Sequence, residues 1–233
     1  MQSFRSKVSR IRDLTHDVRE LELVLCEPLA ITFKAGQFIS FEVPKEGFPY
    51  PVTRPYSIAS SPSNSDKVLL LFNLVRGPGS TYLFNLQEGD EVRFTGPAGA
   101  FYLRHDPTKR IVCVATGTGI APFCSIIPSY LEGNAPQPLS LFWGIRIERD
   151  LYYQYEFQNL ADRYHQFSWT VTLSQPGAAW TGARGRVSGL IEERITSVRD
   201  VAVYLCGNDK MIQDVTATIQ AKGLCPIYRE KYY

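Results

Sequence analysis

The sequence predicts two domains, an antiparallel β-barrel followed by an α/β domain with a doubly wound parallel sheet. Residues 4–103 contain short apolar runs with a period of two, separated by Gly and Pro turns, as expected for strands. From residue 111 onward, continuous apolar runs alternate with helical segments, which is typical of a parallel sheet buried on both faces. Residues 104–109 are polar and contain a proline, so we expect domains at 1–105 and 106–233.

The strands of the first domain follow from the alternation of apolar and polar residues. Leucine occupies every second position of residues 21–25, which indicates that one face of this strand is buried. Further strands are expected at 38–43, 67–76 and 91–95. Several short strands bounded by turns favour a closed or nearly closed barrel.

Residues 76–86 interrupt this strand pattern. Glycines and a proline precede a Ser-Thr pair, and Leu83 and Leu86 follow at helical spacing. The segment predicts a loop that leads into a short helix capped by Ser80. Because a helix N-terminus presents unpaired amides, it can hold a phosphate, although an ordinary connecting helix would have the same pattern.

The second domain begins with the apolar run at 111–115, which predicts a buried strand. A glycine-containing turn follows at 116–121, and Pro122 suits the first turn of a helix. The same reasoning predicts strands at 139–143, 167–173 and 201–206, and helices near 151–163, 188–196 and 209–222.

Two of these strands end in glycine-containing turns. Residues 116–119 read Thr-Gly-Thr-Gly, and residues 206–208 read Cys-Gly-Asn. Ligands of a doubly wound sheet bind beyond the carboxyl ends of its strands, and glycine lets the backbone approach a pyrophosphate closely. Pro122 stands where the third glycine of a G-x-G-x-x-G motif would be, so the strict dinucleotide fingerprint is absent and a turn without a ligand is an equal alternative.

Residues 54–57, Arg-Pro-Tyr-Ser, place a permanent cation, a flat ring and a hydroxyl directly after a predicted strand. The guanidinium of Arg54 suits phosphate oxygens, and Tyr56 offers a face for stacking. Pro55 favours an extended Arg54, so Arg54 and Tyr56 share one face of the strand while Ser57 points to the other. Alone, the stretch also fits an edge strand with a surface arginine.

Composition argues against several classes of protein. The net charge of +2 indicates no strong attraction to nucleic acid or to a membrane surface. The five cysteines are odd in number and include no C-x-x-C, which argues against a disulfide framework, a metal site or an iron–sulfur cluster within this chain. No apolar run reaches membrane-spanning length, and no signal-like segment opens the sequence, so we expect a cytoplasmic protein without membrane insertion.

Taken together and in order, these motifs resemble the ferredoxin–NADP reductase superfamily. The resemblance spans nearly the whole chain and implies a flavin-binding barrel followed by a nicotinamide-nucleotide domain. The motifs that carry it lie at residues 54–57, 79–81, 95–99, 117–122, 206–208 and 230–233.

The resemblance also implies roles for individual residues. Arg54 would bind the FAD phosphates, Tyr56 would lie against the isoalloxazine, and Ser57 would sit near flavin N5. Ser57, Cys206, Glu230 and Tyr232 would form the catalytic set. For FAD, the implied contacts are Pro55 within the first motif, Gly79, Ser80 and Thr81 at the pyrophosphate, and Tyr232, or else Tyr233, over the flavin ring. For NAD(P)H, the implied contacts at the pyrophosphate are Thr116, Gly117, Thr118, Gly119 and Gly207. Cys206 and Glu230 would line the nicotinamide pocket.

The choice of nucleotide rests on arginines. Relatives that prefer NADPH often carry Ser/Thr-Arg after the third strand of the second domain, whereas residues 174–176 here read Ser-Gln-Pro. Arg146 and Arg186 resemble other arginines of bacterial NADPH enzymes, and Arg184 lies nearby, so NADPH is favoured over NADH.

The implied activity is transfer of a hydride from NADPH or NADH to FAD, followed by delivery of single electrons to a ferredoxin or flavodoxin. Two alternatives remain open. One is a reductase of free flavin or ferric iron, and the other is a reductase or electron-relay subunit of an oxygenase system.

Overall fold

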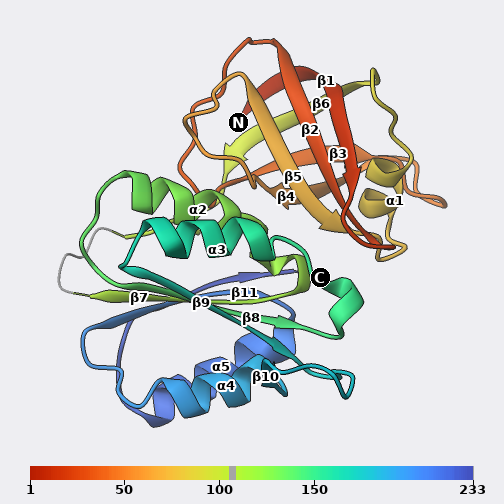
Figure 1. The fold of residues 1–233 in the computed structure, drawn as a ribbon. Coiled ribbons are helices and arrows are strands. Elements are labelled where there is room, and N and C mark those ends of the chain that lie inside the picture. Colours follow the sequence, from red (N-terminus) through yellow and green to blue (C-terminus); the bar gives the residue numbers. More distant parts are fainter. Residues whose placement is uncertain (105–108, 233) are drawn as a thin grey trace. The chain divides into compact units, whose positions relative to one another are not determined.

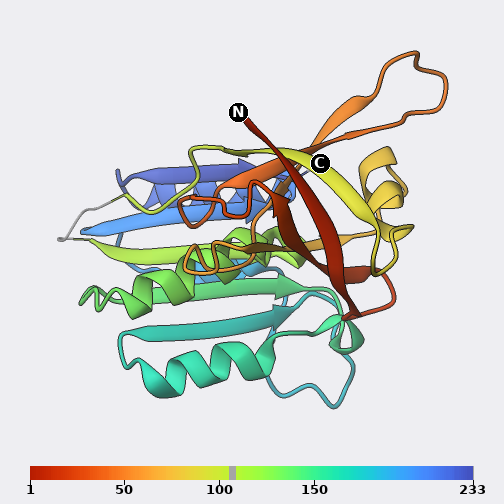
Figure 2. The ribbon, with the colours of Figure 1, turned by 90° about the horizontal axis from the view of Figure 1, so that it is seen from above.

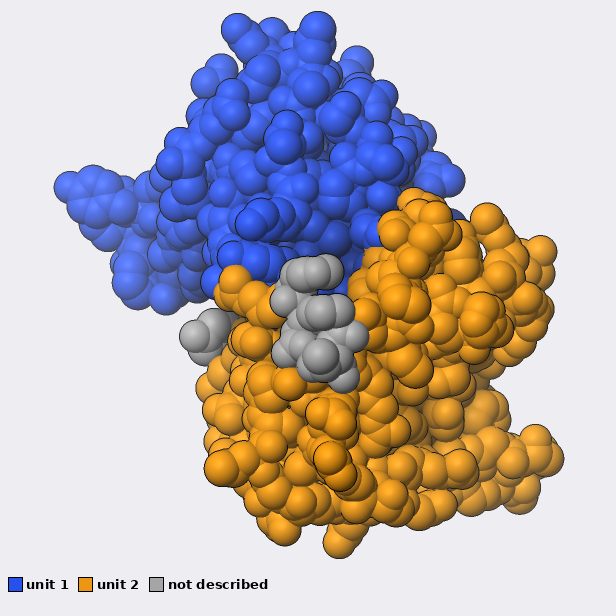
Figure 3. All heavy atoms as spheres, turned by 90° about the vertical axis from the view of Figure 1, so that its left-hand side faces the viewer, with its two compact units in different colours: residues 1–103, 121–129 blue, residues 104–120, 130–233 orange. Residues whose placement is uncertain are grey.

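The computed structural model describes residues 1–104 and 109–232. The chain divides into two compact units, residues 1–103 with 121–129, and residues 104–120 with 130–233 (Figure 3). The boundary expected between residues 105 and 106 lies outside the described residues.

The first unit contains a strongly curved antiparallel sheet. Its strands are β1 (Gln2–Asp13), β2 (Val18–Glu27), β3 (Phe38–Val43), β4 (Val52–Ser57), β5 (Lys67–Asn73) and β6 (Glu91–Ala98). Within the described residues the strand order is β4-β3-β6-β1-β2-β5. The two edges meet just beyond β4, where Ile58 bridges Leu70 and the Ala59 N–H donates to the Leu69 carbonyl at 2.7 Å. The sheet therefore forms the nearly closed barrel that the sequence predicts (Figures 1 and 2).

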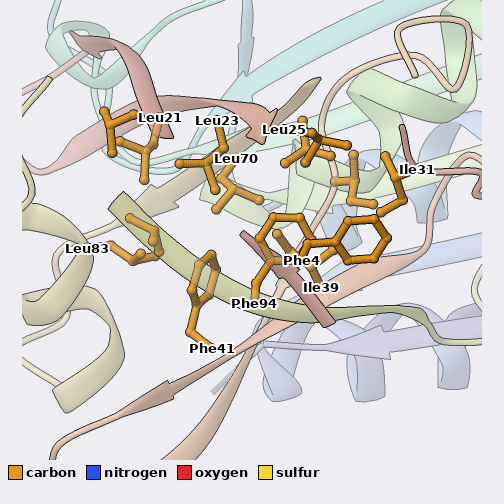
Figure 4. Close-up of a cluster of buried hydrophobic side chains, with 14 of the residues drawn as sticks. Phe4, Leu21, Leu23, Leu25, Ile31, Ile39, Phe41, Leu70, Leu83 and Phe94 are labelled. Carbon is orange, nitrogen blue, oxygen red and sulfur yellow. The ribbon is translucent and has the colours of Figure 1, made fainter. Parts of the chain in front are cut away.

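Alternating apolar residues fill the inside of this sheet (Figure 4). Leu21, Leu23 and Leu25 are all buried, as the period of two predicts. Phe4 and Phe94 stack with ring centroids 5.0 Å apart. Leu83, from helix α1 (Pro78–Phe84), belongs to the same cluster and is fully buried. Burying one such side chain contributes about 1.5–3 kcal/mol, so α1 is anchored to the barrel through its core.

Two predictions for the first unit need correction at the approach to α1. The strand expected at 67–76 ends at Asn73, and Arg76, three residues further on, has a left-handed φ of 53°. A strand cannot continue through that backbone conformation.

The predicted cap of α1 is also wrong. The helix begins at Pro78, and Gly77 occupies the N-cap position without a side-chain cap. Proline suits the first helical position because its missing N–H would have no partner there. Ser80 therefore lies inside the helix, where its hydroxyl donates to the Gly77 carbonyl at 3.2 Å and accepts from the Val75 N–H at 3.3 Å.

The second unit contains a parallel sheet with helices on both faces. Its strands are β7 (Arg110–Thr116), β8 (Leu139–Ile145), β9 (Phe167–Leu173), β10 (Ala183–Arg184), β11 (Val201–Gly207) and β12 (Ile227–Lys231). Helix α3 (Gln154–Arg163) covers one face, and α4 (Val187–Arg194) and α5 (Asp209–Ala221) cover the other (Figure 1). The doubly wound α/β prediction is therefore confirmed. Periodicity predicted neither β10 nor β12.

Helix α3 starts later than predicted, α4 (Val187–Arg194) ends two residues before the expected 196, and α5 starts at residue 209 as predicted. A 3-10 turn (Glu148–Asp150) precedes α3, and Tyr153 has a left-handed φ of 57°, so the helix begins at Gln154 rather than at 151. Helix α5 begins directly after Asn208, whose side-chain oxygen accepts the Met211 N–H at 2.8 Å. This is the N-cap interaction that Asn favours.

The strand order of this sheet places β7 and β11 next to each other, away from its edges. In the described chain the order is β10-β9-β8-β7-β11-β12, so the connections run outward in one direction from β7 and in the other from β11. The carboxyl ends of β7 and β11 therefore border the topological switch point, where ligands of such sheets bind. The 3-10 turn (Gly117–Ile120) follows β7 there and leads into α2 (Ala121–Glu132).

No helix in the described part of the chain is long and apolar enough to cross a membrane. Across the same residues, His, Cys, Asp and Glu side chains form no group of three or more that could hold a metal ion.

Candidate functional site

Arg54, Tyr56 and Gly79 meet at the junction of β4 and α1. A Cβ atom built on Gly79 would lie 2.5 Å from the Tyr56 hydroxyl oxygen and 2.8 Å from Arg54 Cγ. Real Cβ atoms do not approach other atoms so closely, so the first turn of α1 can rest on these two side chains only because residue 79 is glycine. The contact also places Arg54 and Tyr56 on the same face of β4, as the alternation predicts.

The other residues predicted for the site of the barrel unit lie on the same two elements. Ser57 is the last residue of β4 and is buried, in register with Phe38. Ser80 is buried and Thr81 is exposed, both within α1. Pro55 is exposed on β4.

Tyr56 is held rigidly and stays neutral. Its ring makes edge contacts with Phe41 and Phe72, at centroid distances of 5.9 and 5.7 Å. Burial raises the pKa of its hydroxyl to about 12, while the positive charge of Arg54 acts in the opposite direction. The ring therefore offers an uncharged, oriented aromatic surface next to a fixed cation.

The segment between β5 and α1 differs from the sequence prediction at two residues. Val75 and Arg76 were expected to continue a strand, but they form the loop that enters α1, and the Val75 side chain is 56% exposed. The left-handed φ of 53° at Arg76 explains why the extended strand does not continue into α1.

In the second unit, the turn after β7 lies directly against the end of β11. A Cβ on Gly119 would lie 2.4 Å from the Cys206 carbonyl oxygen and 2.7 Å from Gly207 Cα. A Cβ on Gly207 would lie 2.3 Å from Thr116 Oγ1. The two glycine motifs that the sequence predicts at strand ends therefore touch through their backbones.

Hydrogen bonds reinforce this junction. Thr116 Oγ1 accepts from the Asn208 N–H at 3.3 Å and from the Asn208 side-chain amide at 3.1 Å. Thr118 is buried within the turn. Gly117 has a φ of 50°, and a Cβ built on it would meet no atom within 4 Å. One side of the turn is therefore packed against protein, while the backbone of Gly117 is open to a ligand.

The C-terminal segment forms the edge strand β12 instead of a frayed tail. Its parallel register places Glu230 opposite Cys206, and the Tyr232 N–H donates to the Gly207 carbonyl at 2.9 Å. The structure thus brings together Cys206, Glu230 and Tyr232. Tyr233 lies outside the described residues.

Cys206 is fully buried and remains a neutral thiol. Burial raises the pKa of Cys206 well above its ordinary value, and the nearby Glu230 carboxylate raises it further. A hydrogen bond with the Tyr232 side chain acts in the opposite direction. At neutral pH the sulfur is therefore a compact, uncharged group at the end of β11 and is not poised as a nucleophile.

The arginines considered for nucleotide choice have different surroundings. Arg146 Nε donates to Gln175 Oε1 at 3.1 Å, which joins the loops after β8 and β9. Arg186 occupies the N-cap position of α4. Arg184 donates to the carbonyl groups of Gly177, Ala178 and Trp180 and so organises the loop between β9 and β10.

A carboxylate that sequence reasoning missed lies at the same loops. Glu148 Oε1 accepts the Gly177 N–H at 2.7 Å. Carboxylates at this edge of a doubly wound sheet bind ribose hydroxyls, whereas arginines bind a 2′-phosphate. The region therefore presents both kinds of group.

Comparisons of the sequence with known proteins find the same two-part organisation. Residues 5–102 match the family described as the oxidoreductase FAD-binding domain, and residues 113–217 match the oxidoreductase NAD-binding domain. A ferredoxin–NAD(P)(+) reductase component of naphthalene 1,2-dioxygenase/salicylate 5-hydroxylase systems from Ralstonia sp is 33% identical, over 98% of this chain and 69% of that protein. Ferredoxin–NADP reductase B of Sorangium cellulosum is also 33% identical, over 91% of this chain and 88% of that protein.

Two solved structures have the same fold as this chain. The cytochrome P450 reductase GcoB of Amycolatopsis superposes with a TM-score of 0.88 at 26% identity, over 99% of this chain and 69% of that chain. A ferredoxin NADP+ reductase from Neisseria gonorrhoeae, solved with bound FAD and NADP, superposes with a TM-score of 0.84 over the whole of both chains. The two sequences are 20% identical, so this likeness supports the fold alone.

Replacing Gly79 by Ala tests the contact between α1 and β4. The added methyl group must displace Tyr56 and Arg54, so we expect purified Gly79→Ala to carry less than half the flavin of the unaltered protein, measured from the 450 nm to 280 nm absorbance ratio. Gly77→Ala is the matched control, since a Cβ there would meet only Val75 Cγ2 at 3.9 Å. Equal flavin content in the two variants would show that this contact does not support cofactor binding.

Replacing Gly119 by Ala tests the junction of β7 and β11. The methyl group would collide with backbone atoms of Cys206 and Gly207, so we expect the free energy of unfolding to fall by about 1–3 kcal/mol. We also expect NAD(P)H-dependent reduction of dye acceptors to fall at least tenfold. Gly189→Ala is the control, because a Cβ there would meet no atom within 4 Å. Denaturant unfolding and steady-state kinetics measure both quantities, and an unaffected Gly119→Ala protein would contradict the close backbone contact.

Proposed function

This chain belongs to the ferredoxin reductase-like family and is an FAD- and NAD(P)-dependent oxidoreductase, and we propose that it uses NADPH to reduce a ferredoxin or flavodoxin. The single observation that carries the proposal is the junction at the switch point of the sheet. There Gly119 meets Cys206 through the backbone, and Glu230 lies in register with Cys206.

The barrel unit supplies the groups that would hold FAD. Arg54 provides a permanent planar donor for phosphate oxygens, and Tyr56 provides an oriented ring for the isoalloxazine. Gly79 keeps the first turn of α1 close enough for its backbone to contribute to the same site. Ser57, at the end of β4, would lie at the ring edge near N5.

The α/β unit supplies the groups that would orient the nicotinamide nucleotide. The backbone of Gly117 to Gly119 would receive the pyrophosphate, because glycine allows close approach. Cys206 would contact the nicotinamide with a neutral, compact side chain, and Glu230 would accept a hydrogen bond from its carboxamide. Because Tyr232 lies against Cys206, nicotinamide that reaches the thiol must first displace this ring.

Bound FAD supplies the chemistry that links the two-electron donor to a one-electron acceptor, since it can accept a hydride and release electrons singly. The protein's contribution is orientation of the donor and acceptor rings, which lowers the entropic part of the barrier. A ferredoxin as acceptor agrees with the names of the Ralstonia and Sorangium relatives.

Preference for NADPH rests on Arg146 and Arg186 as partners of the 2′-phosphate. Arg146 is positioned by Gln175, and a guanidinium suits a phosphate. Glu148 would favour NADH instead, since its carboxylate beside Gly177 would suit a ribose diol.

A second candidate is the reductase component of an oxygenase system. The Ralstonia relative carries that description, as does the electron transfer component of toluate 1,2-dioxygenase from Pseudomonas putida, which is 30% identical over 98% of this chain. Both candidates share the chemistry above and differ in which protein receives the electrons. The five free cysteines support a reducing, cytoplasmic location in either case.

Anaerobic rapid mixing of the purified protein with NADPH or with NADH tests the function directly. We expect NADPH to bleach the flavin absorbance near 450 nm at least tenfold faster than NADH at equal concentration. Comparable or faster bleaching by NADH would instead favour Glu148 over the arginines as the determinant. A preparation that contains no flavin and binds none would overturn the proposed function.

Replacing Tyr232 by Ser tests whether this ring occupies the nicotinamide position. We expect the Kd for NADP+, measured by difference absorbance, to fall about tenfold, because the nucleotide no longer has to displace an aromatic ring. Tyr155→Ser is the control, since Tyr155 is 76% exposed. Unchanged or weaker binding by Tyr232→Ser would exclude a blocking role for the ring.

A further inference from the structure

Trp143 lies beneath the glycine turn without belonging to any of the motifs above. It stands on β8 in register with Ala115 of β7, one residue before the strand end at Thr116. The side chain is fully buried. Its indole N–H donates to the carbonyl of Gly117 at 3.0 Å.

This hydrogen bond fixes the orientation of one peptide group in the turn. Gly117 is open on the side where a Cβ would be and has a left-handed φ of 50°. Glycine reaches many backbone conformations at little cost, so its own residue type does not select this one. The bond to Trp143 holds the carbonyl oxygen on the protein side of the turn.

The direction of that carbonyl matters for an anion. Pyrophosphate is bound by backbone N–H groups, and a carbonyl oxygen turned toward it would repel it. A carbonyl held by a buried donor cannot rotate toward the ligand without leaving that donor unpaired, which is costly inside a protein. The turn is therefore preorganised with its negative end directed away from the open side.

The indole is itself held in place by neighbouring rings. Tyr152 contacts it edge to face with ring centroids 4.9 Å apart, and Phe157 lies at 6.1 Å. These contacts depend on an aromatic ring at residue 143, whereas the contact with Gly117 depends on the N–H. Phenylalanine at this position would preserve the first and remove the second.

We propose that Trp143 is a positioning residue for NAD(P)H, which acts by holding the Gly117 carbonyl away from the nucleotide pyrophosphate. This inference rests on the proposed function. The role concerns binding and not the hydride transfer step, because the pyrophosphate is remote from the nicotinamide ring.

The test compares Trp143→Phe with Trp169→Phe. Trp169 contacts the same Phe157 ring, at 5.9 Å, but its indole N–H donates to Gln158 on α3 at 3.3 Å. We expect Trp143→Phe to raise KM for NADPH and the Kd for NADP+ about tenfold, the effect of losing one hydrogen bond to a buried group. Flavin content and kcat at saturating NADPH should stay within twofold, and Trp169→Phe should leave KM unchanged.

Two outcomes overturn the inference. One is an unchanged KM in Trp143→Phe, and the other is an equal rise in KM in Trp169→Phe. Failure of the unaltered protein to be reduced by either nucleotide would overturn the proposed function instead, so the two failures are distinguishable.

A second measurement avoids dependence on the folding of Trp143→Phe. The chain contains three tryptophans, so a variant with Trp169→Phe and Trp180→Phe leaves Trp143 as the single source of an indole N–H resonance. We expect this resonance to shift when NADP+ is added to the flavin-bound variant. A resonance unaffected at saturating NADP+ would contradict the role proposed for Trp143.

Discussion

The site in the α/β unit depends on a backbone contact that side chains would prevent. The turn after β7 reaches the end of β11 because Gly119 has no Cβ to strike the Cys206 carbonyl, and Gly207 has none to strike Thr116. This approach brings a turn suited to pyrophosphate to the same edge as the thiol and carboxylate of Cys206 and Glu230. Any side chain at either glycine would separate the two groups.

In the barrel unit, a glycine again permits a close contact, and a buried leucine holds the helix in place. Leu83 fixes α1 in the hydrophobic core, and Gly79, one turn earlier on the same face of the helix, lets the first turn rest on Arg54 and Tyr56. Burial of Leu83 thus stabilises the packing of α1 on the barrel, and the missing Cβ of Gly79 allows the close contact with Arg54 and Tyr56. The position of α1 relative to Arg54 and Tyr56 follows from both contacts, which the helix makes within two turns.

The charges of the side chains in the two candidate sites suit the ligands proposed for each unit. The half-buried Tyr56 and the buried Cys206 both have raised pKa values and remain neutral near pH 7. Because each is an acid whose folded-state pKa lies above its ordinary value, protein stability is unaffected below that ordinary value and declines only in more alkaline solution. Permanent charge is left to Arg54, next to the neutral ring.

The sequence by itself determined the two kinds of domain, the glycine turns at the strand ends and the residue types of both half-sites, because periodicity and turn chemistry are local properties. It misjudged the start of α1, where Pro78 prevails over Ser80, and the end of β5. Only the tertiary structure decided that Glu230 faces Cys206, that Glu148 meets Gly177 and that Trp143 reaches Gly117. Each of those contacts joins residues far apart in the chain, and strand order and register, not local pattern, bring them together.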